Sequence, residues 1–408
     1  MPRPALNCTS RFGLYSGRVI DLTADNVRQR NLARILRLVH LEGPLSRAAL
    51  TETTGLNRST IADLVGQLAR AGVVEERAPD PSRRVGRPSP VVAVDSRLLA
   101  IAVNPEVDAL TVAAVGLDRS IPVRERIDLD HLISPEETAA VVASQIAEWR
   151  SGPLADARIV GVGLAVPGLV RALDGLVRNA PHLNWIDAPI RDLVERATGL
   201  PAVVGNDATL GAVAEHLYGA ARGIDNVVYL NGGASGIGGG LIVHGMPVGG
   251  AGGYAGEFGQ NRPGIASERD RRARDGVLED EVSRARLLAV VGRPSADEPT
   301  LAALLAASTL PDAVAEVARQ RGILATALAN AVNVLNPSVV VLGGFLATIA
   351  ERDIESLRAA VGALAMPASM EGLDIRVAVL AEDRLLSGAA EAAFAVVLAD
   401  PLGHTAPG

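Results

Sequence analysis

The sequence predicts a two-part α/β protein, in which a small helical module ending in a β-hairpin precedes a larger domain of two lobes. Apolar residues recur at helical spacing between residues 24 and 71, and two strand-like segments then flank a loop rich in Pro and Arg. After residue 96, a three-strand meander followed by alternating helices and strands occurs twice. A chain of 408 residues is also too long for one compact core.

The charge of the chain is distributed unevenly. Residues 1–90 hold 14 Arg and 8 acidic side chains, a net charge of +6, whereas the remainder carries −13, which together give the overall −7. This asymmetry is typical of a basic module that binds an anionic partner and is joined to an acidic body.

The composition excludes several classes of protein. No run of 18 or more uncharged apolar residues is present, which argues against a transmembrane helix, and residues 1–13 lack the apolar stretch of a signal peptide. Cys8 is the only cysteine, so neither an intrachain disulfide nor a cysteine-based zinc site can form. We therefore expect a soluble cytoplasmic protein without a metal or other cofactor.

The order of elements up to residue 95 predicts a winged helix-turn-helix, which we place at residues 23–95 after a flexible segment, 1–22. Ser46 and Asn57 stand where N-caps are expected, and Gly55 turns the chain between two helices. The expected elements are helices over 24–41, 47–53 and 58–71 and strands over 73–76 and 91–95, with a loop at 78–90.

The start of the third helix carries side chains suited to reading DNA. Ile61, Leu64 and Leu68 face the core, which leaves Arg58 and Ser59 on the opposite face. In helix-turn-helix docking this end enters the major groove, where Arg reads guanine edges and hydroxyl groups contact bases or phosphate. Asp63 is expected to accept from a cytosine amino group or to pair with an Arg. The candidate DNA-binding residues are Ser46, Arg47, Asn57, Arg58, Ser59, Thr60, Arg83, Arg84 and Arg87.

The last three of these lie in the loop Arg83-Arg84-Val85-Gly86-Arg87-Pro88. An extended Gly-Arg-Pro segment fits a narrow minor groove, whose negative potential attracts Arg. A solvated hairpin with incidental arginines is the alternative, but the position directly after a helix-turn-helix favours DNA contact.

Residues 96–408 predict two lobes, about 96–205 and 206–400, with the C-terminal helix packing back on the first lobe. The β-meanders begin at residues 98 and 226, and the first lobe also predicts a helix over 187–198. Two such lobes around a cleft define the actin-like, or sugar-kinase, architecture.

Several motifs resemble those of the ROK family. Residues 27–95 resemble the N-terminal domain of ROK repressors, and residues 96–400 resemble the ROK sugar-kinase domain. The order of the motifs over about 300 residues makes the resemblance specific. The motifs are Leu45-Ser46-Arg47, Gly55–Thr60, Gly161–Gly168, Pro181-His182-Leu183-Asn184-Trp185, Asn206-Asp207-Ala208, Gly232–Gly240, Ala255–Gly259, Asn336-Pro337 and Leu342-Gly343-Gly344.

The resemblance breaks at the turn that holds ATP phosphates in the family's kinases. Where kinases have D-x-G-G-T, this chain has Asn104-Pro105-Glu106-Val107-Asp108. Two glycines are replaced, Pro105 removes a backbone donor, and two carboxylates would repel a triphosphate. We therefore predict no phosphoryl transfer and no catalytic residue. The second glycine-rich turn, Gly232–Gly240, survives, and by itself it is more typical of close strand packing.

The resemblance implies a sugar site at Asn206, Asp207, Glu257 and Glu279, with Gln260 where the family has a His. Carboxylates suit polyols because each can accept two hydroxyl protons. Without ATP, Asp207 would accept a sugar hydroxyl rather than act as the kinase's general base. The alternative is an empty ancestral pocket. Trp185 and Tyr254 either line this pocket or belong to the core.

The family's zinc site is missing from the sequence. Gln260 replaces the His that follows the Glu, and Asp270, Arg272 and Val277 replace the Cys ligands, so soft thiolates are absent. We expect the charged segment Ser267–Asp275 to be a solvated flexible loop. In zinc-bearing members the metal helps position the sugar-binding residues, so here other contacts must place Glu279.

Together these observations predict a sugar-responsive repressor of carbohydrate-utilisation genes. It would be a homodimer or homotetramer on a palindromic double-stranded DNA operator, with the sugar bound between the lobes. Two alternatives remain: an active ROK sugar kinase with a DNA-binding extension, and a regulator controlled by a protein partner through a vestigial pocket.

Overall fold

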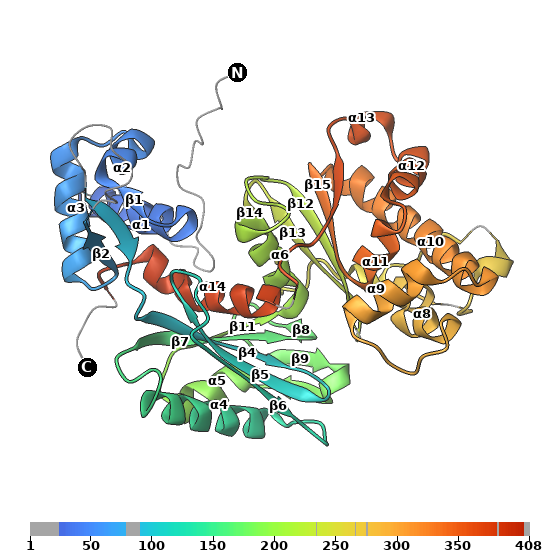
Figure 1. The fold of residues 1–408 in the computed structure, drawn as a ribbon, viewed down its shortest axis with the longest axis horizontal. Helices are drawn as coiled ribbons and strands as arrows, with labels where there is room; N and C mark the ends of the chain where they lie inside the picture. Colours follow the sequence, from blue (N-terminus) through green and yellow to red (C-terminus); the bar gives the residue numbers. More distant parts are fainter. Residues whose placement is uncertain are drawn as a thin grey trace.

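The structure is a computed structural model that describes residues 24–78, 90–233, 235–265, 267–274, 276–381 and 383–403. An N-terminal helical module is followed by two lobes, and the C-terminal helix returns to lie across the first of them (Figure 1). The predicted α/β class is confirmed. The segment 1–22 and the three arginines Arg83, Arg84 and Arg87 lie outside the described residues.

The N-terminal module has the predicted order of helices and strands. Ala49 N donates to Ser46 Oγ over 3.1 Å, and Thr60 N donates to Asn57 Oδ1 over 2.8 Å, so both residues are the expected N-caps. A short unpredicted strand extends the hairpin into a sheet of order β1-β3-β2. The elements are α1 (Ala24–Glu42), β1 (Leu45–Ser46), α2 (Arg47–Thr54), α3 (Arg58–Arg70), β2 (Val74–Arg77) and β3 (Val91–Val94).

The first lobe is a five-stranded sheet with helices on both faces. An antiparallel meander, β6-β5-β4, continues through parallel β7 and β11. Alternate residues of β4 point to opposite faces: Ile101 packs in the cluster that contains α4 and α5, and Ala100 in the one that contains α14. The elements are β4 (Leu98–Pro105), β5 (Ala109–Gly116), β6 (Val123–Asp128), α4 (Pro135–Arg150), β7 (Arg158–Val166), α5 (Ile190–Thr198), β11 (Ala202–Asn206) and α14 (Asp383–Ala399).

The second lobe repeats the same strand topology. Its sheet has the order β14-β13-β12-β15-β16, again a meander followed by two parallel strands. This repeat establishes the predicted two-lobed sugar-kinase architecture. The strands are β12 (Val227–Gly233), β13 (Gly236–Val243), β14 (Met246–Pro247), β15 (Val339–Gly344) and β16 (Asp374–Val377), and α6 (Asp207–Tyr218) connects the lobes.

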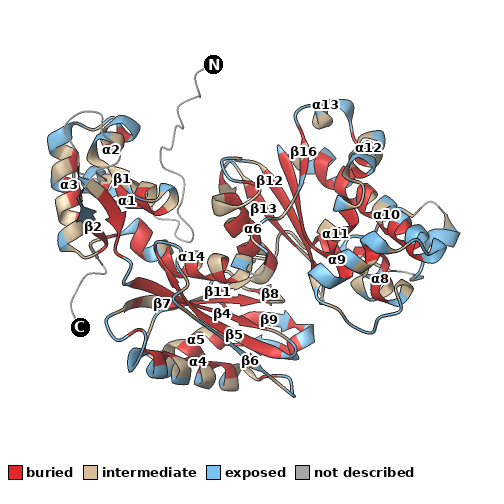
Figure 2. Cartoon of the chain, in the orientation of Figure 1, coloured by how far each residue is buried: buried red, intermediate tan, exposed pale blue. Residues whose placement is uncertain are grey.

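Apolar side chains of most helices of the second lobe pack in one buried cluster with those of this sheet (Figure 2). Among the described helices no single one is long and apolar enough to cross a membrane, and α9 and α10 pass that test only as a pair bent by 118°. The helices are α7 (Leu278–Glu281), α8 (Arg284–Val290), α9 (Glu298–Ala307), α10 (Pro311–Leu335), α11 (Phe345–Glu351), α12 (Ile354–Leu364) and α13 (Pro367–Met370).

A small sheet in the first lobe is absent from the sequence prediction. β8 (Leu169–Val170), β9 (Val177–Ala180) and β10 (Trp185–Ala188) pair in the order β10-β9-β8. The helix expected from residue 187 therefore begins only at Ile190, because the preceding residues pair with β9. Trp185 belongs to the core: it is buried, and its indole N–H donates to the Ile133 carbonyl over 2.8 Å.

The helical module rests directly on the first lobe. Only residues 95–97 separate β3 from β4, and apolar side chains of α1 and α3 join those of β4 and α14 in one cluster. The Arg158 guanidinium donates to the carbonyls of Ala71 and Gly72 over 3.0 and 3.1 Å. Movement of the first lobe is therefore transmitted to the module.

Three polar side chains, which we call the junction cluster, connect this module to two helices of the larger domain; His40 is buried, and Tyr218 and Glu391 are partly buried. His40 of α1 lies 2.9 Å from the Glu391 carboxylate of α14 and 2.7 Å from the Tyr218 hydroxyl of α6. The other ring nitrogen faces the Leu117 carbonyl at 2.6 Å. Because acceptors face both nitrogens, the doubly protonated ring fits this site. Burial alone lowers the pKa of His40, but Glu391 and the Leu117 carbonyl outweigh burial and raise it.

This upward shift predicts a pH-dependent stability. The contribution of His40 is complete below its unfolded pKa of about 6.5 and is lost as the pH rises through the higher pKa of the folded state. We expect the melting-temperature difference between the wild type and His40→Gln to shrink as the pH is raised from 6 to 9.

The matched control is His244→Asn, which alters an exposed His on the second lobe. Its difference from the wild type should stay constant with pH. A melting-temperature difference between the wild type and His40→Gln that does not change with pH would contradict a charged His40–Glu391 pair.

Candidate functional site

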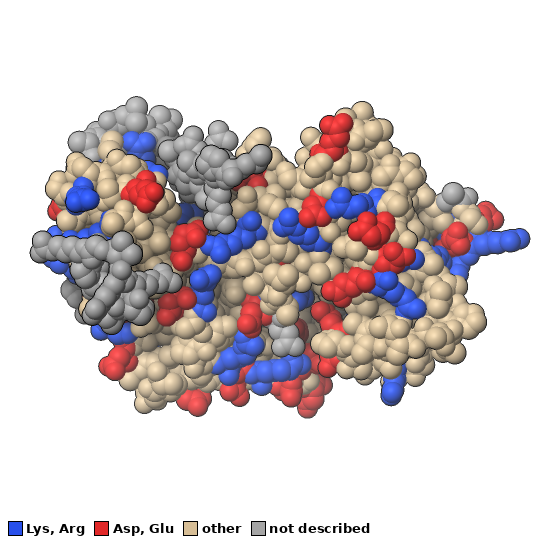
Figure 3. Space-filling model, turned by 45° about the horizontal axis from the view of Figure 1, so that its top comes forward, with Lys and Arg blue, Asp and Glu red and all other residues tan. Residues whose placement is uncertain are grey.

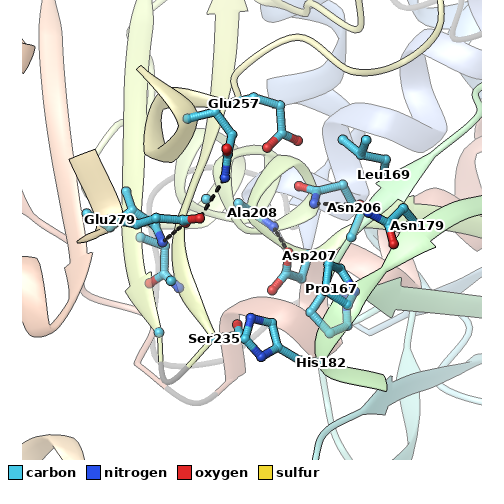
Figure 4. A pocket seen from close by; sticks show the side chains of 18 residues that line it. Pro167, Leu169, Asn179, His182, Asn206, Asp207, Ala208, Ser235, Glu257 and Glu279 are labelled. Carbon is cyan, nitrogen blue, oxygen red and sulfur yellow. Dashed lines mark hydrogen bonds between the residues drawn. The ribbon is translucent and has the colours of Figure 1, made fainter. Parts of the chain in front are cut away.

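A cavity of about 460 Å³ lies between the two lobes and brings together all five predicted sugar-site residues (Figure 4). The first lobe contributes the turn after β7, the segment around β9 and the end of β11, whereas α6, β12, β13, the segment after β14 and α7 contribute the rest. The lining residues are Pro167, Gly168, Leu169, Asn179, Pro181, His182, Asn206, Asp207, Ala208, Asn231, Gly233, Ser235, Gly236, Ile237, Gly238, Glu257, Gln260 and Glu279.

Asn206 and Asp207 occupy the first turn of α6. Asn206 accepts a hydrogen bond from Thr209 N over 2.9 Å and donates to the Gly168 carbonyl over 3.0 Å, so its amide ties α6 to the turn after β7. Asp207 accepts from Ala208 N over 2.8 Å and projects into the cavity (Figure 4). Asn206 therefore positions the helix, while Asp207 presents an acceptor to a ligand.

The carboxylates make this cavity electronegative. Burial raises the pKa of Asp207 to about 6, although the Ala208 N–H and the charge of Arg384 oppose the shift. Burial also raises the pKa of Glu257, and the charges of Asp207 and Glu279 add to that effect. The described lining residues include three carboxylates and neither Lys nor Arg. Such a lining suits hydroxyl donors and opposes an anionic ligand.

Glu279 is held in place by protein groups alone. Gln260 Nε2 donates to Glu279 Oε1 over 2.6 Å, and Ile237 N donates to Glu279 Oε2 over 3.1 Å. Gly236 makes this approach possible: its φ is +131°, and a Cβ there would lie 2.4 Å from the Glu279 carboxylate. The amide that replaces the family's imidazole thus positions the neighbouring carboxylate.

The positions of the family's zinc ligands do not fit a zinc ion. Their side chains are an amide that is already bonded to Glu279, a carboxylate, a guanidinium and an apolar group, at Gln260, Asp270, Arg272 and Val277. Within the described ranges, no three His, Cys, Asp or Glu side chains are grouped to hold a metal.

Asn179, Asn231, His182 and Ser235 also line the cavity, although they were not among the predicted site residues. His182 lies on the short 3₁₀ turn Pro181–Leu183 and stands beside Asp207 and Ser235 (Figure 4). The PHLNW motif contained the signal for His182. Asn179 lies on β9, in the sheet that the sequence did not predict.

The turn at residues 104–108 is closed by a backbone hydrogen bond and by ion pairs with Arg126 of β6. Glu106 N donates to the Ala109 carbonyl over 2.8 Å, which completes the hairpin between β4 and β5. The Arg126 guanidinium lies 2.7 Å from Glu106 and 3.6 Å from Asp108. None of the residues 104–108 is part of the cavity lining.

Of the predicted DNA-reading residues, the six that the structure describes lie at the starts of α2 and α3. Arg58 is exposed, and it makes no hydrogen bond or ion pair with the described part of the chain. Asp63 pairs with Arg28 of α1 at 2.8 Å, the second of the two roles expected for it. Ser46 and Asn57 act as helix caps, and Arg47 is paired with Glu76.

The larger domain offers a different surface. On the face drawn in Figure 3, acidic and basic side chains are interleaved over the two lobes rather than gathered by sign. Long-range attraction of DNA to this face is therefore weak, since neighbouring charges of opposite sign cancel.

A DNA-binding module joined to a sugar-kinase fold defines a class of transcriptional regulators. The chain belongs to the ROK family, whose model matches residues 101–395. It is 25% identical to the xylose repressor of Caldicellulosiruptor bescii over 92% of this chain and 97% of that one. It is 29% identical to the glucokinase of Thermotoga maritima over 69% of this chain and 93% of that one.

Among solved structures too, a regulator matches nearly the whole chain and a kinase matches a smaller part of it. A ROK family transcriptional regulator described as a homologue of the E. coli MLC protein superposes with a TM-score of 0.74 at 23% identity, covering 93% of this chain and 99% of that one. The ROK hexokinase of Thermus thermophilus gives a TM-score of 0.57 at 27% identity, covering 73% of this chain and 99% of that one. The fold of the regulator thus includes the N-terminal module, whereas the kinase matches a smaller share of the chain.

The raised pKa of Asp207 predicts that this residue destabilises the protein without ligand. The pKa of Asp207 is about 6 in the folded state, against 3.8 for the free side chain, so folding is opposed above pH 6, where the buried carboxylate is ionised. This free-energy cost disappears below pH 4, where the carboxyl is protonated in both states. We expect Asp207→Asn to raise the free energy of unfolding by about 1–2 kcal/mol at pH 7, measured by urea denaturation, with the gain vanishing toward pH 4.

Glu125→Gln is the matched control, because Glu125 is an exposed carboxylate on β6. It should change the stability by less than about 0.5 kcal/mol at either pH. A loss of stability in Asp207→Asn at pH 7 would show that Asp207 contributes to folding instead.

Proposed function

We propose that the protein is a transcriptional repressor that binds DNA through its winged helix-turn-helix and is controlled by a sugar in the interlobe cavity. The observation that carries the proposal is the course of α6. This helix begins at Asp207 in the cavity and ends at Tyr218 in contact with α1 of the DNA-binding module. The similarity to xylose repressors over nearly the whole chain supports the same function.

The coupling follows from how each end of α6 is bonded. In the cavity, Asn206 fixes the helix to the first lobe, and a sugar bound to Asp207 and Glu257 would draw the second lobe toward it. At the other end Tyr218 bonds Glu391 and His40, and Arg222 pairs with Glu42 at 2.9 Å. A sugar that binds one lobe arrangement more tightly would thereby shift the DNA-binding modules of a dimer.

The effector we propose is an uncharged sugar such as D-xylose. The three carboxylates in the cavity can accept its hydroxyl protons, and the carboxamides of Asn179, Asn231 and Gln260 can both donate and accept. A sugar phosphate would place its negatively charged phosphate beside the carboxylates of Asp207 and Glu257. The described lining supplies no Lys or Arg to compensate that charge.

We also propose that the protein transfers no phosphoryl group. The hairpin turn at 104–108 presents two carboxylates bound to Arg126, rather than glycine N–H groups, where a triphosphate would have to lie. The surviving glycine run of β13 has a packing role, since a Cβ at Gly238 or Gly240 would lie 2.6 or 2.5 Å from α6 side chains.

DNA recognition by α3 generates the first test. Arg58→Ala should weaken binding to a duplex from the region upstream of its own gene by about 10- to 100-fold, because one good contact of Arg with guanine is worth about 1–3 kcal/mol. Electrophoretic mobility shift at fixed salt measures this loss, and Arg87→Ala tests the loop in the same way.

Arg150→Ala is the control, since it removes one exposed arginine from α4 of the first lobe. It should leave DNA affinity within twofold of the wild type. Unchanged binding in both Arg58→Ala and Arg87→Ala would refute this docking of the module.

A sugar titration tests the effector site. D-xylose or D-glucose should raise the melting temperature and release the operator duplex, whereas glucose 6-phosphate and ATP should do neither. At a sugar concentration 100-fold above Kd the expected stabilisation is about 2.7 kcal/mol. Tyr218→Phe should keep the thermal shift but reduce the sugar's effect on DNA binding, because it breaks the bond between α6 and Glu391.

Two outcomes would favour other functions. ATP-dependent phosphorylation of a hexose that Asp207→Asn abolishes would identify an active kinase. No thermal shift with any sugar of a broad panel would identify a regulator controlled by a protein partner.

A further inference from the structure

A buried ion-pair network, which we call the arginine network, lies beneath the effector site in the second lobe. It consists of Arg319, Glu316 and Gln320 on α10 and Glu281 at the end of α7. Glu281 and Gln320 are fully buried, and Glu316 and Arg319 are only 8% and 9% exposed to solvent. Charges buried to this degree are costly unless every polar atom finds a partner.

Arg319 meets that requirement with all five of its N–H groups. Nε and Nη2 donate to the two Glu316 oxygens over 2.9 and 2.7 Å. Nη1 donates to Glu281 Oε2 over 3.0 Å and to the Asp270 carbonyl over 2.8 Å, and Nη2 also donates to the Glu281 carbonyl over 2.6 Å. The guanidinium therefore joins α10, α7 and the segment before α7 at one point.

Glu281 extends this network to the backbone of that segment. Its carboxylate accepts hydrogen bonds from Arg272 N and Ala273 N, both over 2.9 Å. These residues lie among the positions where the family carries zinc-binding cysteines. Most described side chains of the charged segment are exposed, as its composition predicts, but a buried carboxylate holds its backbone at residues 272 and 273.

The network and the effector site share one helical turn. α7 spans only Leu278–Glu281, so Glu279 in the cavity and Glu281 in the network are two residues apart. Gln320 also fixes the second residue after α7, since Ser283 N donates to Gln320 Oε1 and Gln320 Nε2 donates to the Ser283 carbonyl, each over 3.1 Å. Any displacement of the network must therefore move Glu279.

We propose that Arg319, Glu281, Glu316 and Gln320 are positioning residues that perform without metal the task for which zinc-bearing relatives use an ion. They hold residues 270–274 and 276–283 so that Glu279 meets Gln260 and the effector. The effector response of this chain is then independent of divalent metal. This inference rests on the proposed effector site.

The charge states agree with this role. Burial opposes ionisation of Glu281 and Glu316. The backbone N–H groups of Ala273 and Arg272, together with Arg319, outweigh burial and lower the pKa of Glu281, and the Arg319 and Gln320 side chains do the same for Glu316. Both therefore stay ionised at neutral pH, and the net negative charge of the three ionised groups is partly compensated by Arg272, whose charge acts on Glu316.

The test compares Arg319→Met with the wild type in the full-length protein. D-xylose binding measured by calorimetry should weaken about 10- to 100-fold, the range found when groups that orient a binding residue are removed. Operator binding without sugar should stay within threefold, because the winged helix-turn-helix is remote from α10 (Figure 1). Amide exchange at Arg272, Ala273 and Ile237 should accelerate, since the last of these bonds Glu279.

Arg352→Met is the matched control in the same lobe. Its guanidinium also donates to backbone carbonyls, those of Leu305 and Ser308, but it makes no bond to residues 267–274 or 276–283. It should lower stability without changing D-xylose affinity or the three amides. If Arg319→Met does not fold, Glu281→Gln replaces it, because that change keeps the shape of the side chain and removes its charge.

The outcomes distinguish failure of the proposed effector site from failure of the positioning role of the arginine network. Wild-type protein that binds no sugar refutes the effector site, and amide exchange then decides the arginine network alone. A folded Arg319→Met with unchanged D-xylose affinity and unchanged amides overturns the inference. The inference is also overturned if the wild-type protein loses sugar binding or amide protection in EDTA and regains it with Zn²⁺. Sugar binding and amide protection that are unchanged in EDTA support the inference.

Discussion

The close contact between α6 and β13 is the constraint on which the rest of the structure depends. Glycines at 238 and 240 bring the strand so near to the helix that any Cβ would collide with Ala208 and Ala212. This contact fixes where α6 begins, in the cavity, and where it ends, against α1 and α14. One helix therefore carries the effector site at its N-terminus and the link to the DNA-binding module at its C-terminus.

The cavity concentrates negative charge, and the surrounding structure accommodates it by two means. Burial raises the pKa of both Asp207 and Glu257, so hydroxyl donors of a ligand would stabilise their ionised forms. Glu279 instead receives donors from Gln260 and Ile237, and its helical turn is anchored by the arginine network. Loss of the family's metal ligands thus coincides with a protein-based support for the same carboxylate.

Much of the architecture follows from local patterns in the sequence. The spacing of Ile61, Leu64 and Leu68 gives α3, and its N-cap Asn57 is where the pattern begins. The central strands β4, β5, β7 and β15 are readable because they are nearly continuous apolar runs buried on two faces. The small sheet of β8–β10 was missed because its strands are two to four residues long and mix apolar and charged residues, too short for any periodicity.

The sequence by itself determined the fold class, the position of the helix caps and the identity of five of the polar residues at the cavity, because these depend on local spacing and on motifs in a fixed order. Only the tertiary structure decided what those residues contact. That Asn206 ties two segments together, that Gln260 holds Glu279, and that Arg319 reaches residues 49 and 38 positions away all depend on chain packing. Contacts at such separation leave no periodic signal, since each is made by a single pair of residues brought together by the whole fold.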